Sequence, residues 1–379
     1  MIQTIKDHIK NIGGWRTTDR YVVLAFDDYG NVRLRDSAAA DTLTELGHAP
    51  RNHFDIRDHL ETRADLEAMR DVLTSVTDAA GRGAVLSAYF TPTNLDFDAL
   101  EEWDATSDPH PPLVSLTETF ARAAQRDEGA YAGAWDLWQD LFARDLAAPY
   151  YHGRQHFNTK AFVEKWREGD AALRAACAQG SLARLTSRDS AGRKIYAALD
   201  IGSASELPDI AAEILDGADR FEAVFGHRSR VFNPPAGRAH PDLHETLAEA
   251  GLWYLEAPYK EAYHLGDGKR RTMVSRTGDV ASRSTRKIVR NVVFEPGPNG
   301  IDASIMAARA SVSAAFRMGK PAIISSHRVN FGTYIDPAHG KANLEALRKL
   351  LKHIIADHPT IRFVSTYELG VIMDGGRPV

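Results

Sequence analysis

The sequence predicts an α/β fold, an irregular (β/α)7-type barrel with helical and loop insertions. Short apolar runs alternate with segments whose apolar residues recur at three-to-four spacing for most of the 379 residues. The runs are apolar at consecutive positions, which is typical of parallel strands covered by helices on both faces. Seven or eight such units follow one another, which favours a closed or nearly closed barrel over an open sheet.

Eight segments are predicted strands. The first is Tyr21–Phe26, and the others are 84–90, 149–151, 230–232, 252–256, 288–294, 321–325 and 361–365. Helical periodicity predicts helices over 59–79, 159–178, 206–225, 241–250, 302–318 and 341–357. Strand–helix alternation of this kind is the pattern of parallel βαβ units.

Two stretches interrupt the alternation, and we expect residues 1–379 to form a single barrel domain that carries them as insertions. The first, 95–148, is rich in Trp and Asp and contains Pro-His-Pro-Pro and helical segments near 116–147. The second, 258–287, is rich in Arg, Gly and Ser. Because loops after the strands build the site in such barrels, either insertion could serve as a lid.

Composition narrows the class of protein. With 44% hydrophobic and 26% charged residues, the chain can bury a core, which excludes disorder and a disulfide scaffold. The net charge of -5 gives no reason to expect nucleic acid as a partner. No apolar run is long enough for a membrane span, and the first ten residues lack the apolar stretch of a signal peptide. We therefore expect a cytoplasmic protein, of open oligomeric state, in which the single Cys177 is a small buried hydrophobe.

Two acidic residues, Asp27 and Asp28, end the first predicted strand. Carboxylates at the end of a buried strand are costly without a partner, and strand ends form the mouth of the site in parallel α/β folds. One carboxylate could bind a metal while the other takes a proton. The alternative is a polar turn or an N-cap, since Asp and the following Gly30 are turn residues.

Two histidines, His152 and His156, lie four residues apart (156 − 152) with Gly153 between them. On one helical turn or a tight loop, both imidazoles could reach a single cation, and imidazole nitrogens suit zinc and similar divalent metals. In a chain with 15 histidines, the alternative is a pair of surface residues.

The segment 231–238 places Asn233-Pro-Pro-Ala-Gly237-Arg238 after a predicted strand. Two prolines followed by glycine make a rigid loop, which could present backbone N–H groups to a developing oxyanion or could be a structural turn.

The strand 321–325 leads into His327, Arg328 and Asn330. A histidine at a strand end is a candidate general acid or base, with its polar neighbours contacting substrate, although a lone histidine is more often structural. Glu295, which follows the predicted strand 288–294, could contact substrate or cap the next helix.

Taken together, these motifs resemble those of the polysaccharide deacetylase superfamily, the NodB-type carbohydrate esterases, over residues from about 20 to 370. The resemblance implies Asp27 as general base and His327 as general acid. It also implies one divalent metal ion, most commonly zinc, on Asp28, His152 and His156.

The chain departs from the family pattern in its third motif. Asn233 and Ala236 stand where Arg and Tyr are usual, so the base would be oriented differently, by Asn233 or by Arg238. The departures look like those of a divergent branch associated with surface-polysaccharide gene clusters.

The implied function is a metal-dependent hydrolase that removes an acyl group, acetyl above all, from a sugar, an oligosaccharide or a polysaccharide precursor. The expected substrate-binding residues are Arg154, Asn233, Arg238, Glu295, Arg328 and Asn330. One alternative is a glycoside hydrolase whose carboxylate pair comes from Asp27, Glu256 and Glu295. The other is a carbohydrate-binding homologue that keeps the metal and has lost turnover, which the altered third motif would support.

Overall fold

The structure, a computed structural model, describes residues 8–183 and 188–376; the first seven residues, part of the stretch examined for a signal peptide, lie outside it. It confirms the predicted α/β barrel. Its main sheet has the hydrogen-bonded order β10-β7-β6-β5-β2-β1-β12-β11, with β13 beside β1, and the paired strands are parallel. The strands are β1 (Arg20–Tyr29), β2 (Leu86–Phe90), β5 (Ala147–Tyr151), β6 (Val231–Phe232), β7 (Tyr254–Pro258), β10 (Arg286–Arg290), β11 (Val292–Val293), β12 (Ala322–His327) and β13 (Ile361–Phe363).

One continuous stretch, residues 286–293, closes the barrel. Its first part, β10, pairs with β7, and its second part, β11, pairs with β12. Asn291 separates the two parts. Its side-chain amide donates to the carbonyl of Pro321 at 2.8 Å and accepts from the N–H of Ile323 at 2.9 Å, so its side chain joins the β12 ladder where the strand is interrupted.

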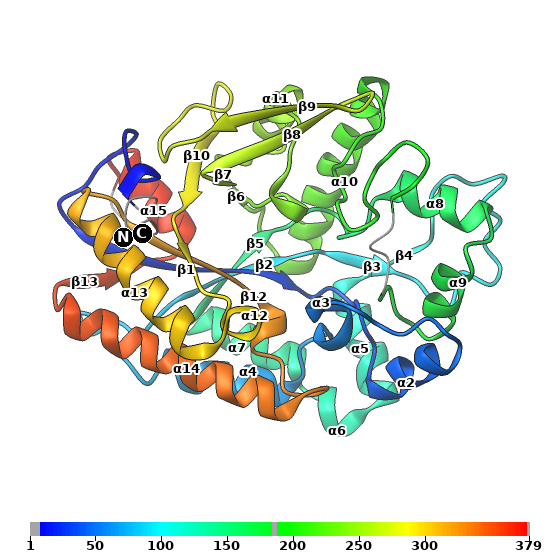
Figure 1. Cartoon of the computed structure of the whole chain (residues 1–379), viewed down its shortest axis with the longest axis horizontal. Helices are drawn as coiled ribbons and strands as arrows, with labels where there is room; N and C mark the ends of the chain where they lie inside the picture. The colour runs from blue at the N-terminus through cyan, green and yellow to red at the C-terminus, as the bar shows by residue number, and fades with distance from the viewer. Residues whose placement is uncertain (1–7, 184–187, 377–379) are drawn as a thin grey trace.

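Helices cover the outside of the barrel (Figure 1). They are α2 (Ser37–Glu45), α3 (His53–Arg57), α4 (Arg63–Leu73), α5 (Leu116–Arg126), α6 (Glu128–Tyr131), α7 (Ala134–Ala143), α8 (Thr159–Arg167), α9 (Ala171–Ala178), α10 (Leu207–Phe225), α11 (His244–Glu249), α12 (Pro296–Asn299), α13 (Ile301–Arg317), α14 (Pro337–Asp357) and α15 (Thr366–Met373). Within the described residues, none of these helices has the length and apolar character needed to cross a membrane.

The predicted helix over 159–178 is wrong in its length, because it is two helices, α8 and α9. Gly169 between them has a φ of 72°, in the left-handed region that ends helices. Asp170 then starts α9 as its N-cap by accepting from the N–H of Leu173 at 3.0 Å. Both signals are present in the sequence, since a glycine is typical of the end of one helix and the aspartate after it is typical of the N-cap of the next.

The two predicted insertions hold short elements of their own. Residues 95–148 include most of the antiparallel hairpin β3 (Thr93–Leu95) and β4 (Leu113–Ser115), followed by α5, α6 and α7. Residues 258–287 contain the antiparallel hairpin of β8 (Lys260–Gly266) and β9 (Lys269–Val274), drawn at the top of Figure 1. The turn of this second hairpin is fastened where the N–H of Asp267 donates to the carbonyl of Gly202 at 2.7 Å.

The barrel interior is filled by side chains that alternate along the strands. The members of this inner cluster from the strands are Tyr21, Val23, Ala25, Tyr89, Tyr150, Val231, Tyr254, Ile288 and Ile323. Leu369 and Met373 of α15 join them near the N-terminal ends of the strands. The barrel is therefore a packed core rather than a pore, and its polar interior positions lie at the C-terminal ends of the strands.

Candidate metal and acid–base site

The strand alternation that packs the barrel also directs polar side chains to one place. Asp27, His152, Asn233 and Arg290 each lie two residues after a member of the inner cluster, and His327 lies four residues after Ile323. Because side chains two apart share a face of a strand, these five groups converge at the C-terminal end of the barrel interior.

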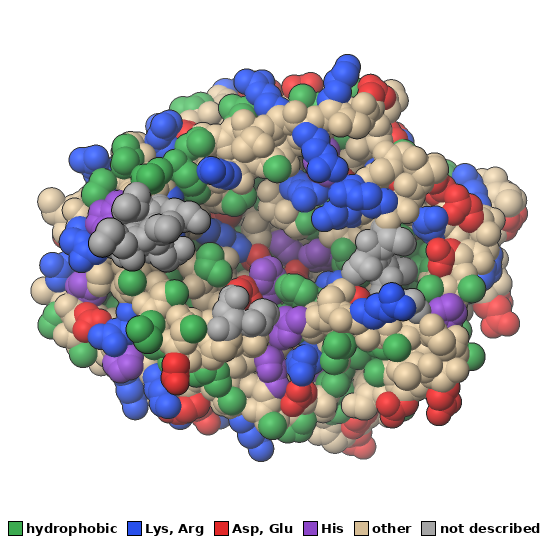
Figure 2. Space-filling model, in the orientation of Figure 1, with side chains coloured by type: hydrophobic (Ala, Val, Ile, Leu, Met, Phe, Trp, Pro, Cys, Tyr) green, Lys and Arg blue, Asp and Glu red, His purple; other side chains and the backbone are tan. Residues whose placement is uncertain are grey.

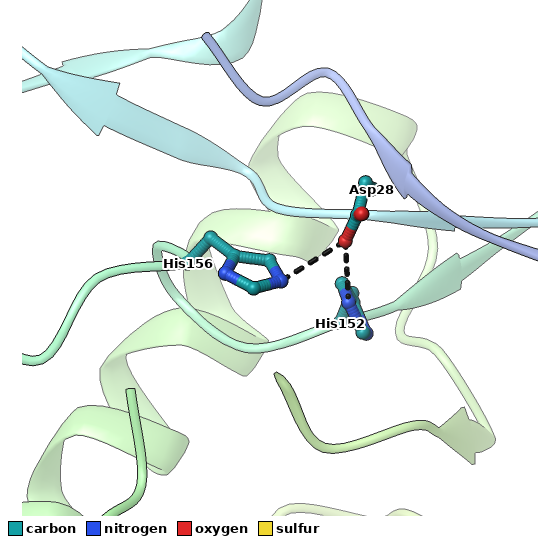
Figure 3. A group of neighbouring side chains, drawn as sticks. All are labelled: Asp28, His152 and His156. Atoms are coloured by element: carbon teal, nitrogen blue, oxygen red, sulfur yellow. Dashed lines mark hydrogen bonds and ion pairs between the residues drawn. The ribbon is translucent and has the colours of Figure 1, made fainter. Parts of the chain in front are cut away.

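Asp28, His152 and His156 form a buried cluster (Figure 3). The Oδ1 atom of Asp28 lies 2.9 Å from Nε2 of His156 and 3.3 Å from Nε2 of His152. Ligands at about 2.0–2.2 Å from one zinc ion lie roughly 3–3.6 Å from each other, so these separations suit a shared metal. Asp28 has a φ of 74°, a left-handed conformation uncommon outside glycine, which takes its side chain out of the alternation of β1.

The hydrogen bonding of His152 tests whether the cluster fits a cation. Its Nδ1 lies 2.7 Å from the carbonyl oxygen of Asn233, a contact that requires a proton on Nδ1. In the neutral ring, Nε2 then carries a lone pair, and that lone pair faces the Asp28 carboxylate. A cation bound between the two groups would satisfy both acceptors, and the donor set of two imidazole nitrogens and one carboxylate oxygen fits a divalent metal such as zinc. Among the described residues, this is the single group of three His, Cys, Asp or Glu side chains spaced to hold a metal.

Asp27 is held by Arg290 and Asn233. The Arg290 guanidinium donates to both carboxylate oxygens, at 2.6 and 2.7 Å, and the Asn233 amide donates to Oδ1 at 2.8 Å. Burial raises the pKa of Asp27, but the charge and hydrogen bonds of Arg290 outweigh it and lower the pKa. The carboxylate therefore stays ionised near neutral pH and can accept a proton.

The orientation of Asp27 was predicted to come from Asn233 or Arg238. Asn233 makes that contact, whereas Nη1 of Arg238 lies 3.3 Å from Nε2 of His264. Arg290 was not predicted as a site residue. Its signal was present, since the inner-cluster residue Ile288 precedes it by two positions at the end of a strand.

His327 faces Asp27 from the neighbouring strand. The two residues are register partners in the β1–β12 pair, and Nε2 of His327 lies 3.8 Å from Oδ2 of Asp27. On its other side, Nδ1 lies 2.7 Å from Oε1 of Glu295, and Asn330 donates to Oε2 of the same carboxylate at 2.5 Å. Burial lowers the pKa of His327, but Glu295 and the two aspartates outweigh it and raise the pKa to about 10. The ring is thus a protonated donor at neutral pH.

Two predicted substrate-binding arginines lie in other surroundings. Arg154 pairs with Asp216 of α10 at 3.0 Å. Arg328 is 3% exposed, and its guanidinium binds Asp58 at 2.6 Å and Glu61 at 2.8 Å. Both side chains are therefore engaged by acidic groups of the protein itself rather than brought beside Asp27 and His327.

A separate cavity of about 970 Å³ lies between the first insertion and α8–α9. Trp103, Trp166 and Cys177 are among the residues that line it, and none of the predicted catalytic or metal-binding residues does. The chemistry-bearing groups are gathered instead at the strand ends, where Figure 2 shows histidine and acidic side chains on the floor of a central hollow.

No family model and no curated protein sequence matches the chain. Among solved structures it has distant similarity to a family 4 carbohydrate esterase from Streptomyces lividans in complex with acetate, at 13% identity over 95% of this chain and 97% of that one, with a TM-score of 0.34. It is also similar to Puue allantoinase, at 10% identity over 96% and 94% of the two chains, with a TM-score of 0.47.

A third likeness is to the 4-alpha-glucanotransferase from Thermococcus litoralis, at 11% identity and a TM-score of 0.44. That match covers 92% of this chain but 40% of the glucanotransferase, so this chain spans less than half of that protein's length. At this level of identity, the activity has to be argued from the site itself.

Proposed function

We propose that this chain is a metal-dependent hydrolase that removes an acyl group, acetyl first among them, from a sugar, an oligosaccharide or a polysaccharide precursor. The observation that carries the proposal is the placement of Asp27 and His327 on adjacent strand ends, with Nε2 of His327 3.8 Å from Oδ2 of Asp27. Asp28 continues the same strand into the Asp–His–His cluster. A hydrolase that attacks an acyl carbon with water needs this combination.

Each residue has a distinct task in this proposal. Asp28, His152 and His156 would hold the divalent ion, which when bound polarises the acyl carbonyl and a water molecule. Asp27 takes a proton from the attacking water while Arg290 and Asn233 keep its carboxylate in place. Nε2 of His327 gives its proton to the leaving nitrogen or oxygen as the bond to the acyl carbon breaks. Glu295 fixes the ring through Nδ1.

The geometry gives less support to a glycoside hydrolase that uses Glu256. That side chain is 0% exposed, its carboxylate accepts from Nε of Arg290, and Thr366 donates to it at 2.9 Å. A catalytic carboxylate must reach the glycosidic oxygen or the anomeric carbon of the substrate. The Glu256 carboxylate instead binds the Arg290 guanidinium and helps to fix its position.

The test is acetate release from a panel of acetylated sugars, before and after chelation and after refilling with zinc. We expect release that stops on chelation and returns with the ion, and that Asp27→Asn abolishes while its metal content stays normal. Release that persists in the chelated protein, or an equal rate in Asp27→Asn, would overturn the proposal. Binding of acetylated sugars to the metal-loaded protein without acetate release would favour the non-catalytic alternative.

A further inference from the structure

We propose that the substrate carries a negatively charged group, a carboxylate or a phosphate, which binds a cluster of basic side chains at one edge of the hollow. This inference rests on the proposed function and names its substrate class more closely. We call the cluster the basic rim; its members are Lys194, Arg238, His264 and Arg270.

The basic rim is built by the β8–β9 hairpin together with two loops. His264 and Arg270 are cross-strand partners in the hairpin. Nη1 of Arg238 lies 3.3 Å from Nε2 of His264, and Nδ1 of His264 lies 2.5 Å from Oδ1 of Asp200. The backbone N–H of Lys194 donates to the other oxygen of Asp200 at 3.2 Å. The buried Asp200 carboxylate thus contacts Arg238, His264 and the backbone of Lys194, and Arg270 lies beside the cluster as the cross-strand partner of His264.

Short connections join the basic rim to the catalytic groups. The ring of Tyr196, two residues after Lys194, lies 5.7 Å from the ring of His156. Asn158, two residues after His156, donates to the carbonyl of Asp200 at 2.8 Å. In Figure 2, Lys and Arg side chains gather along one edge of the central hollow, above the histidine and acidic side chains of its floor.

The charges of the basic rim are not balanced within the protein. Asp200 is 2% exposed and already engaged by His264, and Arg238 lies 4.0 Å from it. Among the described residues, the side chains of Lys194 and Arg270 contact no acidic group. Burial lowers the pKa of Lys194, and the charges of Arg238, Arg188 and Arg270 lower it further against the opposing charge of Asp200. A bound anion would relieve the repulsion among these cations.

The chemistry of the side chains identifies the ligand. Guanidinium groups present paired donors that match the oxygens of carboxylates and phosphates, and an ammonium group adds a point charge. Arg270 is exposed and Arg238 is partly exposed, so an anion in the hollow can reach both. An acylated sugar that bears such a group would be anchored at the basic rim while its acyl group lies over Asp27 and His327.

The experiment compares matched acetylated sugars that are neutral, carry a carboxylate or carry a phosphate, on the zinc-loaded enzyme. We expect kcat/KM to be at least about tenfold higher for one or both anionic substrates, and to fall toward the neutral value in 0.5 M salt. The double variant Lys194→Gln/Arg270→Gln should lose most of that preference, mainly through KM, and leave the neutral substrate within about twofold. Arg271→Gln is the matched control, because Arg271 is adjacent on the same exposed strand but pairs with Tyr263 instead of His264.

A second measurement separates failure of this inference from failure of the proposed function. Glucuronate, glucose 6-phosphate and glucose are titrated calorimetrically into zinc-loaded Asp27→Asn, with and without the double substitution, after thermal unfolding has shown that each variant folds. Anion-selective binding that the double substitution removes supports the basic rim, even if no acetylated sugar is hydrolysed. Hydrolysis of neutral and anionic sugars at equal rates, without selective binding, overturns the basic rim and leaves the hydrolase proposal standing. The stronger of the two anions identifies the group as carboxylate or phosphate.

Discussion

The Arg290 guanidinium binds both carboxylate oxygens of Asp27 and, through Nε, the carboxylate of Glu256. One cation thus links the candidate base to a carboxylate that is fully buried. Removing a member of a buried charge group leaves another charge uncompensated, which typically costs about 3–5 kcal/mol. Arg290 therefore contributes both to stability and to the acid–base state of Asp27.

Replacing Arg290 with Gln should weaken catalysis without removing the metal. Arg290 lowers the pKa of Asp27, so its loss raises that pKa, and the acidic limb of the kcat profile moves to higher pH. We expect kcat near pH 7 to fall by roughly 10²-fold or more, within the usual range for acid–base catalysis. Arg290→Lys keeps the positive charge but not the paired donors. In this variant the acidic limb should lie close to its position in the parent protein, while kcat should stay well below the parent value. An unmoved acidic limb in Arg290→Gln would contradict this role.

His152→Ala and His156→Ala should each lose most bound zinc, because each substitution removes one of the three proposed ligands. Metal analysis of the purified variants after dialysis against zinc measures the loss. His227→Ala is the control, since His227 is exposed and hydrogen bonds through Nδ1 to the carbonyl of Phe225. Zinc content equal to that of the parent protein in both ligand variants would sink the metal assignment.

The two neighbouring aspartates should fail in different ways. Asp28→Ala removes a ligand and should lose both metal and activity. Asp27→Asn should keep metal and fold but lose most of kcat, because an amide cannot accept the proton of water. Measuring zinc and acetate release in the same preparation separates the two outcomes. Near-normal turnover in Asp27→Asn would exclude Asp27 as the base.

Glu295→Gln should narrow the pH range of activity from the alkaline side. Glu295 contributes to raising the pKa of His327 to about 10, so removing its charge lowers that pKa. His327 then loses its proton at lower pH, and the alkaline limb of kcat for an amide substrate moves down. The shift of the alkaline limb should be smaller for an activated aryl acetate, because its leaving group needs little protonation. An equal shift for both substrates would argue against His327 as the proton donor.

The sequence was sufficient to predict the fold class and four of the five groups that converge at the strand ends, all but Arg290. Asp27, His152 and His327 follow apolar strands, and parallel strands bring such positions to one end of the barrel. The sequence motifs alone could not show that Arg290 reaches Asp27. The two residues are 263 positions apart, and their contact depends on the closure of the barrel.

The sequence also could not show which of the arginines near the motifs contact the site and which pair with acidic residues elsewhere. Arg154 and Arg328 have the same chemistry as Arg290, and each is adjacent or close to a predicted site histidine. What distinguishes them is which acidic groups the fold brings near: Asp216 of α10 for Arg154, and Asp58 for Arg328. Such pairings between residues far apart in the sequence produce no local pattern from which they could be predicted.

The closure of the barrel by residues 286–293 ties the alignment of the proposed base to a joint made of short strand pairings. Arg290 is the last residue of β10, directly before the interruption at Asn291, and β11 beyond it is only two residues long. Slight heating that loosens this joint would draw Arg290 away from Asp27 while the rest of the barrel stays folded. Thermal loss of the proposed activity should therefore precede the loss of helical signal, and a substitution that tightens this joint should raise the temperature at which that activity is lost.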